Sequence, residues 1–305
     1  MSTTDPSAPI TSQPDTAPCL ERILLATDGS PTSRVAEDLL LALALPSGTA
    51  VRVMVATAAR DWDVSEYLQL TETTWGEHVA AGAIERLGER GLTISREISD
   101  GDPAHEILRA ADSFDADLIV VGSKGRSGLA GWLLGSVARN VVRHSRRPVV
   151  VARPLRRGLS RVLLATDGSA HAEHAQRYLG RLPLPEDAQV SVAHVLRPYT
   201  PYLAPDPFFP GALDEVVAKA VQERRADADA LLATAAAGAA QPGRTIHPVL
   251  LHGDPAHELL ALAADSQPDL IVAGARGVSA LEGLMFGSVA DRLVKHAPCS
   301  VLIVP

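Results

Sequence analysis

Two glycine-rich segments of the chain have the residue types and spacing of an anion-binding loop. Both follow the pattern G-x2-G-x9-G-S, and they comprise Gly122, Gly125, Gly135 and Ser136 in one case, and Gly274, Gly277, Gly287 and Ser288 in the other. Glycine lets backbone N–H groups approach a phosphate closely, and the unpaired N–H groups and dipole of a helix N-terminus favour negative charge. The sequence therefore predicts two phosphate-binding loops, each running into a helix.

The loops belong to an internal repeat. ILLATDGS at 23–30 returns as VLLATDGS at 162–169, and GDPAHEIL at 101–108 returns as GDPAHELL at 253–260. The first pair is offset by 139 positions (162 − 23) and the second by 152 (253 − 101), so the second copy contains 13 additional residues (152 − 139), which we place near 197–212. The repeat predicts two domains, 20–155 and 159–305, after a polar, proline-rich tail at 1–19 that we expect to be disordered.

Short apolar runs separated by helical patterns are typical of an α/β fold. In the first half we expect strands near 22–27, 51–57, 92–98, 117–122 and 148–152. These runs are too uniformly apolar to alternate, as in strands that are buried on both faces. We expect helices at 32–45, 64–90 and 102–112 and a fourth that opens at Gly135-Ser136. Each half is thus predicted to be a doubly wound, five-stranded parallel sheet with four helices.

Composition excludes several function classes. No apolar run approaches the roughly 18 residues that span a bilayer, so we expect no membrane insertion. The formal net charge of −8 argues against nucleic-acid binding, which needs a basic face. The two cysteines, Cys19 and Cys299, are too few for a disulfide framework. A cytoplasmic location is the simplest expectation.

The repeated loops, together with the Thr-Asp-Gly-Ser segments and the Gly-Asp-Pro-Ala-His segments, resemble the universal stress protein family. The resemblance covers about 20–305 and is specific to tandem members of the ATP-binding subclass, whose marker is G-x2-G-x9-G-[ST]. It implies two Rossmann-like domains of the adenine nucleotide α hydrolase type. It also implies that the terminal strands at 148–151 and 299–304 pair the two halves within one chain, while homodimerisation stays open.

By this resemblance each half binds ATP, with Mg²⁺ bridging phosphate oxygens. The strand-end residues would line the nucleotide pocket, and the loop residues would hold ribose and phosphates. The implied site residues are Ala26, Asp28, Ala56, Gly122, Lys124, Gly125, Arg126, Gly135, Ser136 and Val137 in the first half, and Ala165, Asp167, Val195, Gly274, Arg276, Gly277, Gly287, Ser288 and Val289 in the second.

The two sites are not identical in sequence. Lys124 and Arg126 flank the first loop, whereas Arg276 and Val278 occupy the matching positions of the second. Because charge-assisted hydrogen bonds to phosphate are the stronger ones, we expect tighter phosphate binding in the first half.

Three functions are consistent with these residues. The first is a nucleotide-responsive regulator of stress adaptation or growth that acts on an unknown protein partner. The second is a slow ATPase or phosphotransfer enzyme in which Asp28 or Asp167 organises Mg²⁺ and water. The third is a scaffold that needs no nucleotide and uses the aromatic segment at 197–212. Because the sequence contains no G-x-S-x-G and no HExxH motif, we expect no dedicated catalytic residue.

Overall fold

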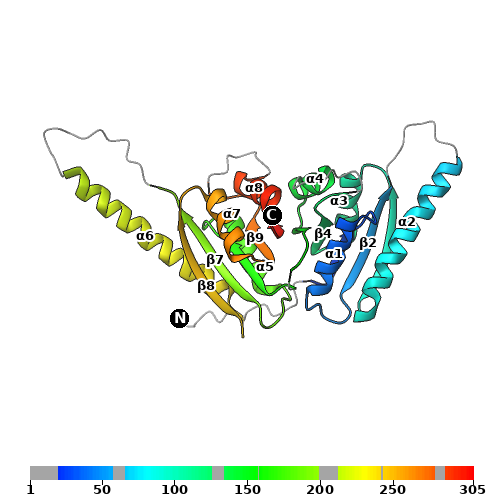
Figure 1. Cartoon of the computed structure of the whole chain (residues 1–305), viewed down its shortest axis with the longest axis horizontal. Helices are drawn as coiled ribbons and strands as arrows, with labels where there is room; N and C mark the ends of the chain where they lie inside the picture. The colour runs from blue at the N-terminus through cyan, green and yellow to red at the C-terminus, as the bar shows by residue number, and fades with distance from the viewer. Residues whose placement is uncertain are drawn as a thin grey trace, which may run out of the picture.

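The computed structural model of the chain describes residues 20–57, 66–125, 134–156, 158–198, 212–241, 243–278 and 286–305. Each half alternates strands and helices (Figure 1). The elements of the first half are β1 (Arg22–Ala26), α1 (Pro31–Ala42), β2 (Ala50–Thr57), α2 (Glu66–Leu87) with a 3₁₀ turn at Gly88–Arg90, β3 (Thr93–Asp100), α3 (Pro103–Ser113), β4 (Leu118–Gly122), α4 (Ser136–His144) and β5 (Val149–Ala152). Those of the second are β6 (Arg161–Ala165), α5 (Ala170–Arg181), β7 (Gln189–Leu196), α6 (Ala212–Ala239), β8 (Thr245–His252), α7 (Pro255–Ser266), β9 (Leu270–Gly274), α8 (Ser288–His296) and β10 (Ser300–Val304).

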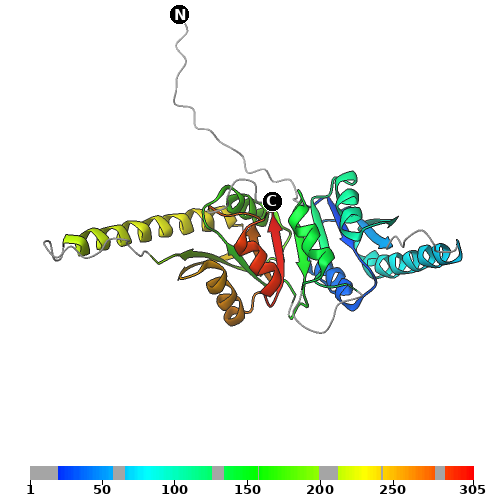
Figure 2. The same ribbon diagram turned by 90° about the horizontal axis from the view of Figure 1, so that it is seen from above.

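The ten strands form one continuous sheet in the order β3-β2-β1-β4-β5-β10-β9-β6-β7-β8. Within each half all neighbouring strands are parallel, which confirms the doubly wound fold. The halves meet where β5 and β10 pair in antiparallel, with Val151 opposite Val301 (Figure 2). The expected pairing of the terminal strands is therefore confirmed.

Helices cover both faces of the sheet. One apolar cluster combines residues of α1, α2, α5 and α6 with one face of the strands, and a second combines α3, α4, α7 and α8 with the other. Because the central strands are covered on both sides, runs such as Leu118–Val121 are buried throughout, and this explains their uniformly apolar sequence.

Short polar residues start the helices that border the candidate sites. The side chains of Ser30 and Ser169 accept hydrogen bonds from Ser33 N and Ala172 N at the starts of α1 and α5. Asp102 and Asp254 cap α3 and α7 in the same way, and each is followed by a proline at the first helical position. These caps fix the turns that leave β1, β6, β3 and β8.

The 13 additional residues of the second half are shared between two places, so the expectation that they fall near 197–212 is only partly right. The connection from β7 to α6 covers 197–211, 15 residues, against 8 residues at 58–65 from β2 to α2. The remaining six lengthen the helix, because α6 has 28 residues and α2 has 22. Accordingly α6 extends past the end of the sheet (Figure 1).

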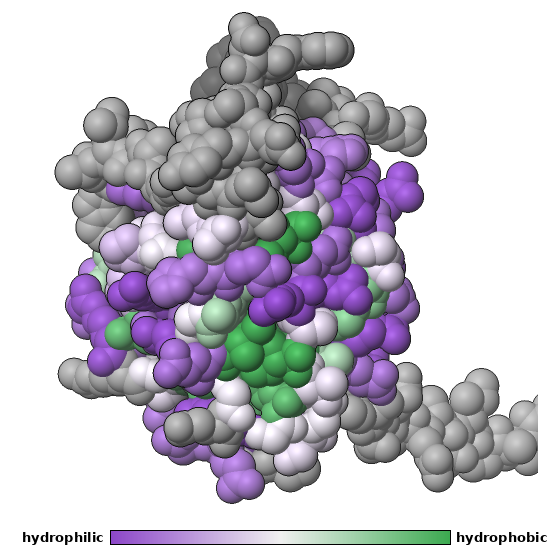
Figure 3. Space-filling model, turned by 90° about the vertical axis from the view of Figure 1, so that its right-hand side faces the viewer, coloured by the Kyte–Doolittle hydropathy of each residue, from purple (hydrophilic) through white to green (hydrophobic). Residues whose placement is uncertain are grey.

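The two outer strands have features that discourage further pairing. Pro248 interrupts the row of backbone N–H donors along β8, because proline has no N–H group. The other outer strand, β3, has charged side chains at Arg96 and Glu97, which oppose pairing with another chain. Figure 3 views the end of the molecule beside α2 and β3, where hydrophilic residues surround a smaller apolar patch. Leu92, Ile94 and Ile98 at this end are partly buried against the core.

Candidate functional site

Both candidate sites lie where parallel strands end and a helix begins. β4 ends at Gly122 and α4 begins at Ser136, while β9 ends at Gly274 and α8 begins at Ser288. In open α/β sheets, the crevice outside the carboxyl ends of the strands is where ligands bind.

The glycine that precedes each of these helices closes the loop and leaves the helix without a side-chain cap. Gly287 N–H donates to Ala275 O over 2.8 Å, and Gly135 N–H donates to Ser123 O over 2.9 Å. Both glycines are N-caps with extended backbone, and neither helix start has a side-chain cap hydrogen bond. Among the described residues, no backbone hydrogen bond links the N–H groups of Ser288 and Val289 to an acceptor, and the first-turn N–H groups of a helix have no partner within the helix itself.

An aspartate follows the first strand of each half, and in the second half its hydrogen bonds hold the glycine-rich loop in place. Asp167 accepts hydrogen bonds from Ser169 N at 3.0 Å and from Val278 N at 2.9 Å, so its carboxylate joins the turn after β6 to the loop after β9. Asp28 likewise accepts from Ser30 N at 3.1 Å. A Cβ at Gly277 would lie 2.2 Å from Asp167 Oδ2, which explains the glycine there.

The first glycine of each loop is required for packing, a role that our sequence interpretation did not include, while its proposed role of admitting a phosphate stays a prediction. A Cβ at Gly122 would lie 2.6 Å from Thr32 O, and one at Gly274 would lie 2.6 Å from the carbonyl carbon of His171. These neighbours are backbone atoms in the first turns of α1 and α5, which cannot move aside independently. The strand end and the helix start are therefore in direct backbone contact.

A cavity of about 380 Å³ lies at the second site. All nine residues expected there line it: Ala165, Asp167, Val195, Gly274, Arg276, Gly277, Gly287, Ser288 and Val289. Its size is within the range of small-molecule pockets. The structure thus brings together residues that are up to 124 positions apart (289 − 165) in the sequence.

The walls of this cavity divide by chemistry. Leu259 of α7, Val289 of α8 and Phe286 contribute apolar surface, whereas Arg197, Arg224 and Arg276 contribute positive charge. Asp254 at the start of α7 is held ionised, because the N–H of His257, together with Arg292 and Arg197, keeps the pKa of its carboxyl below the usual value. An apolar wall beside cationic groups and the N–H donors of a helix start suits a ligand with a flat apolar part and a polyanionic part.

The described residues of the first site repeat this arrangement. Thr32 Oγ1 donates to Lys124 O over 2.5 Å, and a Cβ at Gly125 would lie 3.1 Å from Asp28 Oδ2. Ala26, Ala56 and Val137 belong to one apolar cluster, as Ala165, Val195 and Val289 do in the second half. Arg126 and the aromatic segment from Tyr199 onward lie outside the described residues, so the roles expected of them stay predictions.

Sequence reasoning missed several lining residues. Pro255 and Leu259 belong to the repeated block GDPAHELL at 253–260, which we used as evidence for the repeat and for the family resemblance but did not place at the site. The strands β8 and β9 are parallel and end at the same edge of the sheet. Since α7 follows β8 and the glycine-rich loop follows β9, the topology alone would have placed α7 beside the loop. Arg197 and Arg224 come from the region in which the halves differ in length, so the repeat offers no signal for them.

Comparison with known proteins identifies the family. The sequence model described as the universal stress protein family matches residues 20–153 and again residues 158–305. The chain belongs to the universal stress protein family.

Relatives match either one half or the whole chain. A universal stress protein of Thermus aquaticus is 36% identical over 143 residues, which is 47% of this chain and 96% of that protein. Universal stress protein Rv1996 of Mycobacterium tuberculosis is 26% identical over 307 residues, 92% of this chain and 94% of that one. The crystal structure of a universal stress protein from Archaeoglobus fulgidus has a TM-score of 0.64 at 20% identity, and covers 93% of this chain and 98% of that one. The last of these shows likeness of fold.

This universal stress protein has no helix, among its described residues, that is long and apolar enough to cross a membrane. A group of three or more potential metal-ligating His, Cys, Asp or Glu side chains is also absent from that part of the chain.

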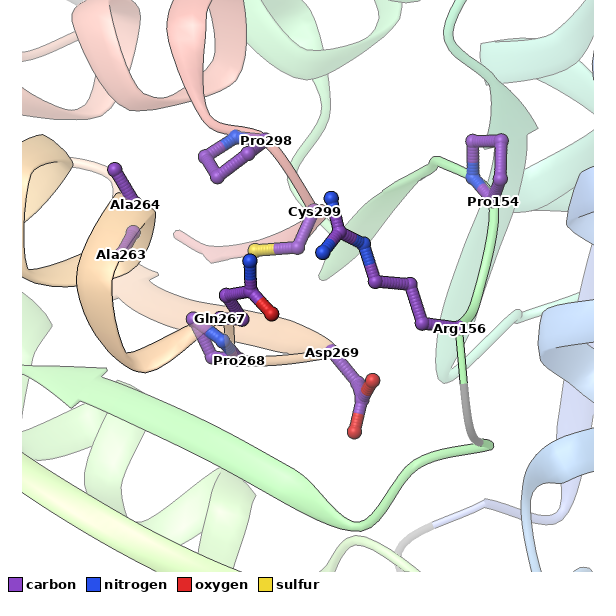
Figure 4. A pocket seen from close by; sticks show the side chains of 9 residues that line it. All are labelled: Pro154, Arg156, Ala263, Ala264, Gln267, Pro268, Asp269, Pro298 and Cys299. Carbon is purple, nitrogen blue, oxygen red and sulfur yellow. The ribbon is translucent and has the colours of Figure 1, made fainter.

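A second, much smaller cavity lies at the junction of the halves (Figure 4). Pro154 and Arg156 border it from the segment after β5, and Gln267, Asp269 and Cys299 border it from the second half. Its volume of about 40 Å³ suits ordered water and is far too small for a nucleotide. This cavity is therefore no second ligand site.

We expect the Cys299 thiol to be chemically inert in the folded protein. Cys299 is 5% exposed, and burial raises the pKa of its thiol to about 12. Only about one thiol in 10⁴ would be ionised at pH 8, and the thiolate is the reactive form. In Cys19→Ser protein, labelling with a thiol reagent should be at least about 100-fold slower without urea than in denaturing urea, with glutathione as the reagent control. Rapid labelling of the folded protein would contradict this burial.

Proposed function

We propose that this universal stress protein binds one ATP in each half and acts as a nucleotide-responsive regulator of stress adaptation or growth. The observation that carries the proposal is the cavity at the second site, which is lined by all nine residues that the resemblance to ATP-binding members of the family implies. The matching loop of the first half supports a second site of the same kind.

The chemistry of the second cavity suits each part of ATP. The adenine would lie against the apolar wall near Val195 and Leu259, where a flat ring is shielded from water. The phosphates would lie at the start of α8, where the N–H groups of Ser288 and Val289 and the side chain of Arg276 are donors. Mg²⁺, when bound, would neutralise phosphate charge and be held chiefly by phosphate oxygens.

The arrangement favours binding over catalysis. Both carboxylate oxygens of Asp167 accept backbone hydrogen bonds, so this residue organises the loop. Ligand binding to the folded state stabilises it by linkage, and a ligand that prefers one conformation shifts the population towards it. In this proposal the protein, located in the cytoplasm, reports nucleotide occupancy to a protein partner through such a shift.

The test is the number of nucleotides bound per chain. We expect gently purified protein to release ATP on denaturation, and calorimetric titration of Mg·ATP into emptied protein to give two sites per chain. ADP, AMP and cyclic AMP should be titrated in parallel, and product formation followed over hours should remain at the buffer rate. No retained nucleotide together with no heat of binding would overturn the proposal, and a single site per chain would overturn the pairing of sites.

A further inference from the structure

The helix that begins the second site is held by two arginines of the first half. Arg143, in the last turn of α4, places a guanidinium nitrogen 2.7 Å from Asp291 Oδ1, in the first turn of α8. Arg153, directly after β5, donates to Val294 O over 2.6 Å and to Cys299 O over 3.2 Å. One arginine therefore acts at each end of α8.

Arg153 is built into the junction between the halves. It is 7% exposed, and burial lowers the pKa of its guanidinium. Its backbone is fixed to β10, because Arg153 N donates to Ser300 Oγ over 3.0 Å and Ser300 Oγ donates to Arg153 O over 3.2 Å. A cation at the carbonyl end of a helix satisfies orphan acceptors and complements the helix dipole. Arg153 thereby fixes the position of α8 along its axis.

Arg143 acts on the charge near the proposed phosphates. Asp291 is the acidic residue in the first turn of α8, where a negative charge would repel phosphate. Although burial raises the pKa of Asp291, its hydrogen bonds with Lys295 and Arg143 hold the pKa below the usual value. Its negative charge is thus permanent at neutral pH and is offset by these two cations.

The residues that match these arginines in the second half do not support α4, the corresponding helix of the first half. At the repeat offset of 152, Arg143 corresponds to Lys295 and Asp291 to Arg139, so the mirror contact would bring two cations together. Arg153 corresponds to Pro305, which has no side-chain donor. In addition, the first turn of α4 contains no acid that would need neutralising. The first half supports α8, and the residues at the matching positions of the second half cannot give α4 the same support.

We propose that Arg143 and Arg153 are positioning residues for the second nucleotide site, which the first half therefore completes, while the first site is independent of the second half. This inference rests on the proposed function. It assigns the fusion of the two halves a specific role, since the second phosphate helix depends on cations from the first half.

The test uses single-site proteins. Ser136→Asp should disable the first site and keep only the second, and Ser288→Asp should disable the second site and keep only the first. In the Ser136→Asp protein we expect Arg143→Gln to raise the dissociation constant for Mg·ATP about fivefold and Arg153→Met about tenfold. In the Ser288→Asp protein the same changes should alter affinity less than about twofold, because the hydrogen bonds and ion pairs of both arginines with described residues all go to the second half. Arg146→Gln, an exposed neighbour outside both contacts, is the charge-matched control.

Rescue distinguishes positioning from general destabilisation. Adding Asp291→Asn to Arg143→Gln should restore most of the affinity, because it removes the acid whose charge Arg143 offsets. If Arg153→Met fails to fold, Arg153→Lys retains one donor and should give a smaller loss confined to the second site. Equal losses at both sites, no loss at the second, or no rescue by Asp291→Asn would overturn the inference. If the single-site parents themselves bind no ATP, the proposed function fails first, and this inference falls with it.

Discussion

Replacing Ser288 with aspartate is expected to remove ATP binding from the second half while leaving the protein at least as stable. Ser288 is exposed and is the first residue of α8. A carboxylate at this position complements the helix dipole and should contribute about 0.3–1 kcal/mol of stability. The same carboxylate would lie beside bound phosphate, where two like charges about 4 Å apart repel by about 4 kcal/mol near a protein surface.

The affinity of the second site should therefore fall by at least about 100-fold, and titration should then count one ATP per chain instead of two. The control variant Ser288→Asn introduces a side chain of the same size as aspartate but without its charge. We expect its affinity for ATP at the second site to stay within about tenfold of that of the unchanged protein. The mirror variant Ser136→Asp should leave the other site, and the double variant none. An unchanged count of two for Ser288→Asp in folded protein would show that phosphate does not bind at the start of α8.

The two single-site proteins also test the ranking of the sites. Lys124 and Arg126 favour the first half, but the second cavity adds Arg197 and Arg224, which a comparison of the loops alone does not count. The ranking inferred from the loops stays a prediction. A lower dissociation constant for Ser136→Asp than for Ser288→Asp would show that these arginines outweigh the loop residues.

Most of the fold follows from the sequence because its signals are local and repeated. The same signals recur in both halves: uniformly apolar runs, Asp-Pro helix starts at Asp102 and Asp254, and sharp turns at Gly29 and Gly168, which have positive φ. Each prediction is therefore supported by two segments of the sequence. The pairing of β5 with β10 is predicted as well, but from the family resemblance and not from local signals.

What the sequence does not predict depends on long-range geometry. The sequence does not predict the length of α6, because its six additional residues, 212–217 (ALDEVV), have no counterpart in the helix of the first half, and nothing in them marks where a loop becomes a helix. The contact of Arg153 with the end of α8 is not predicted from the sequence for a different reason. An arginine after a strand predicts a solvated side chain, and only the antiparallel junction brings it to the end of α8.

Substituting alanine for Gly122 should destabilise the first half by about 2–3 kcal/mol, the upper range for overpacking a well-packed contact. The added methyl carbon would lie 2.6 Å from Thr32 O and 2.9 Å from the carbonyl carbon of Thr32, so α1 must move away from β4. Gly274→Ala should act in the same way on α5, because its Cβ would approach the backbone of His171 and Ala172. Urea unfolding followed by circular dichroism, with the nucleotide removed, measures the change.

Gly82→Ala is the matched control, since it makes the same change in α2 where a Cβ meets nothing within 4 Å. There we expect stabilisation of about 0.5–1 kcal/mol from helix propensity. If Gly122→Ala lowers the free energy of unfolding and Gly82→Ala raises it, the requirement for the first glycine of the loop motif comes from strand–helix packing. A neutral Gly122→Ala would contradict the close backbone approach. Since packing alone requires that glycine, its presence in a sequence indicates the fold, and the case for nucleotide binding must rest on the uncapped helix start and the cavity beside it.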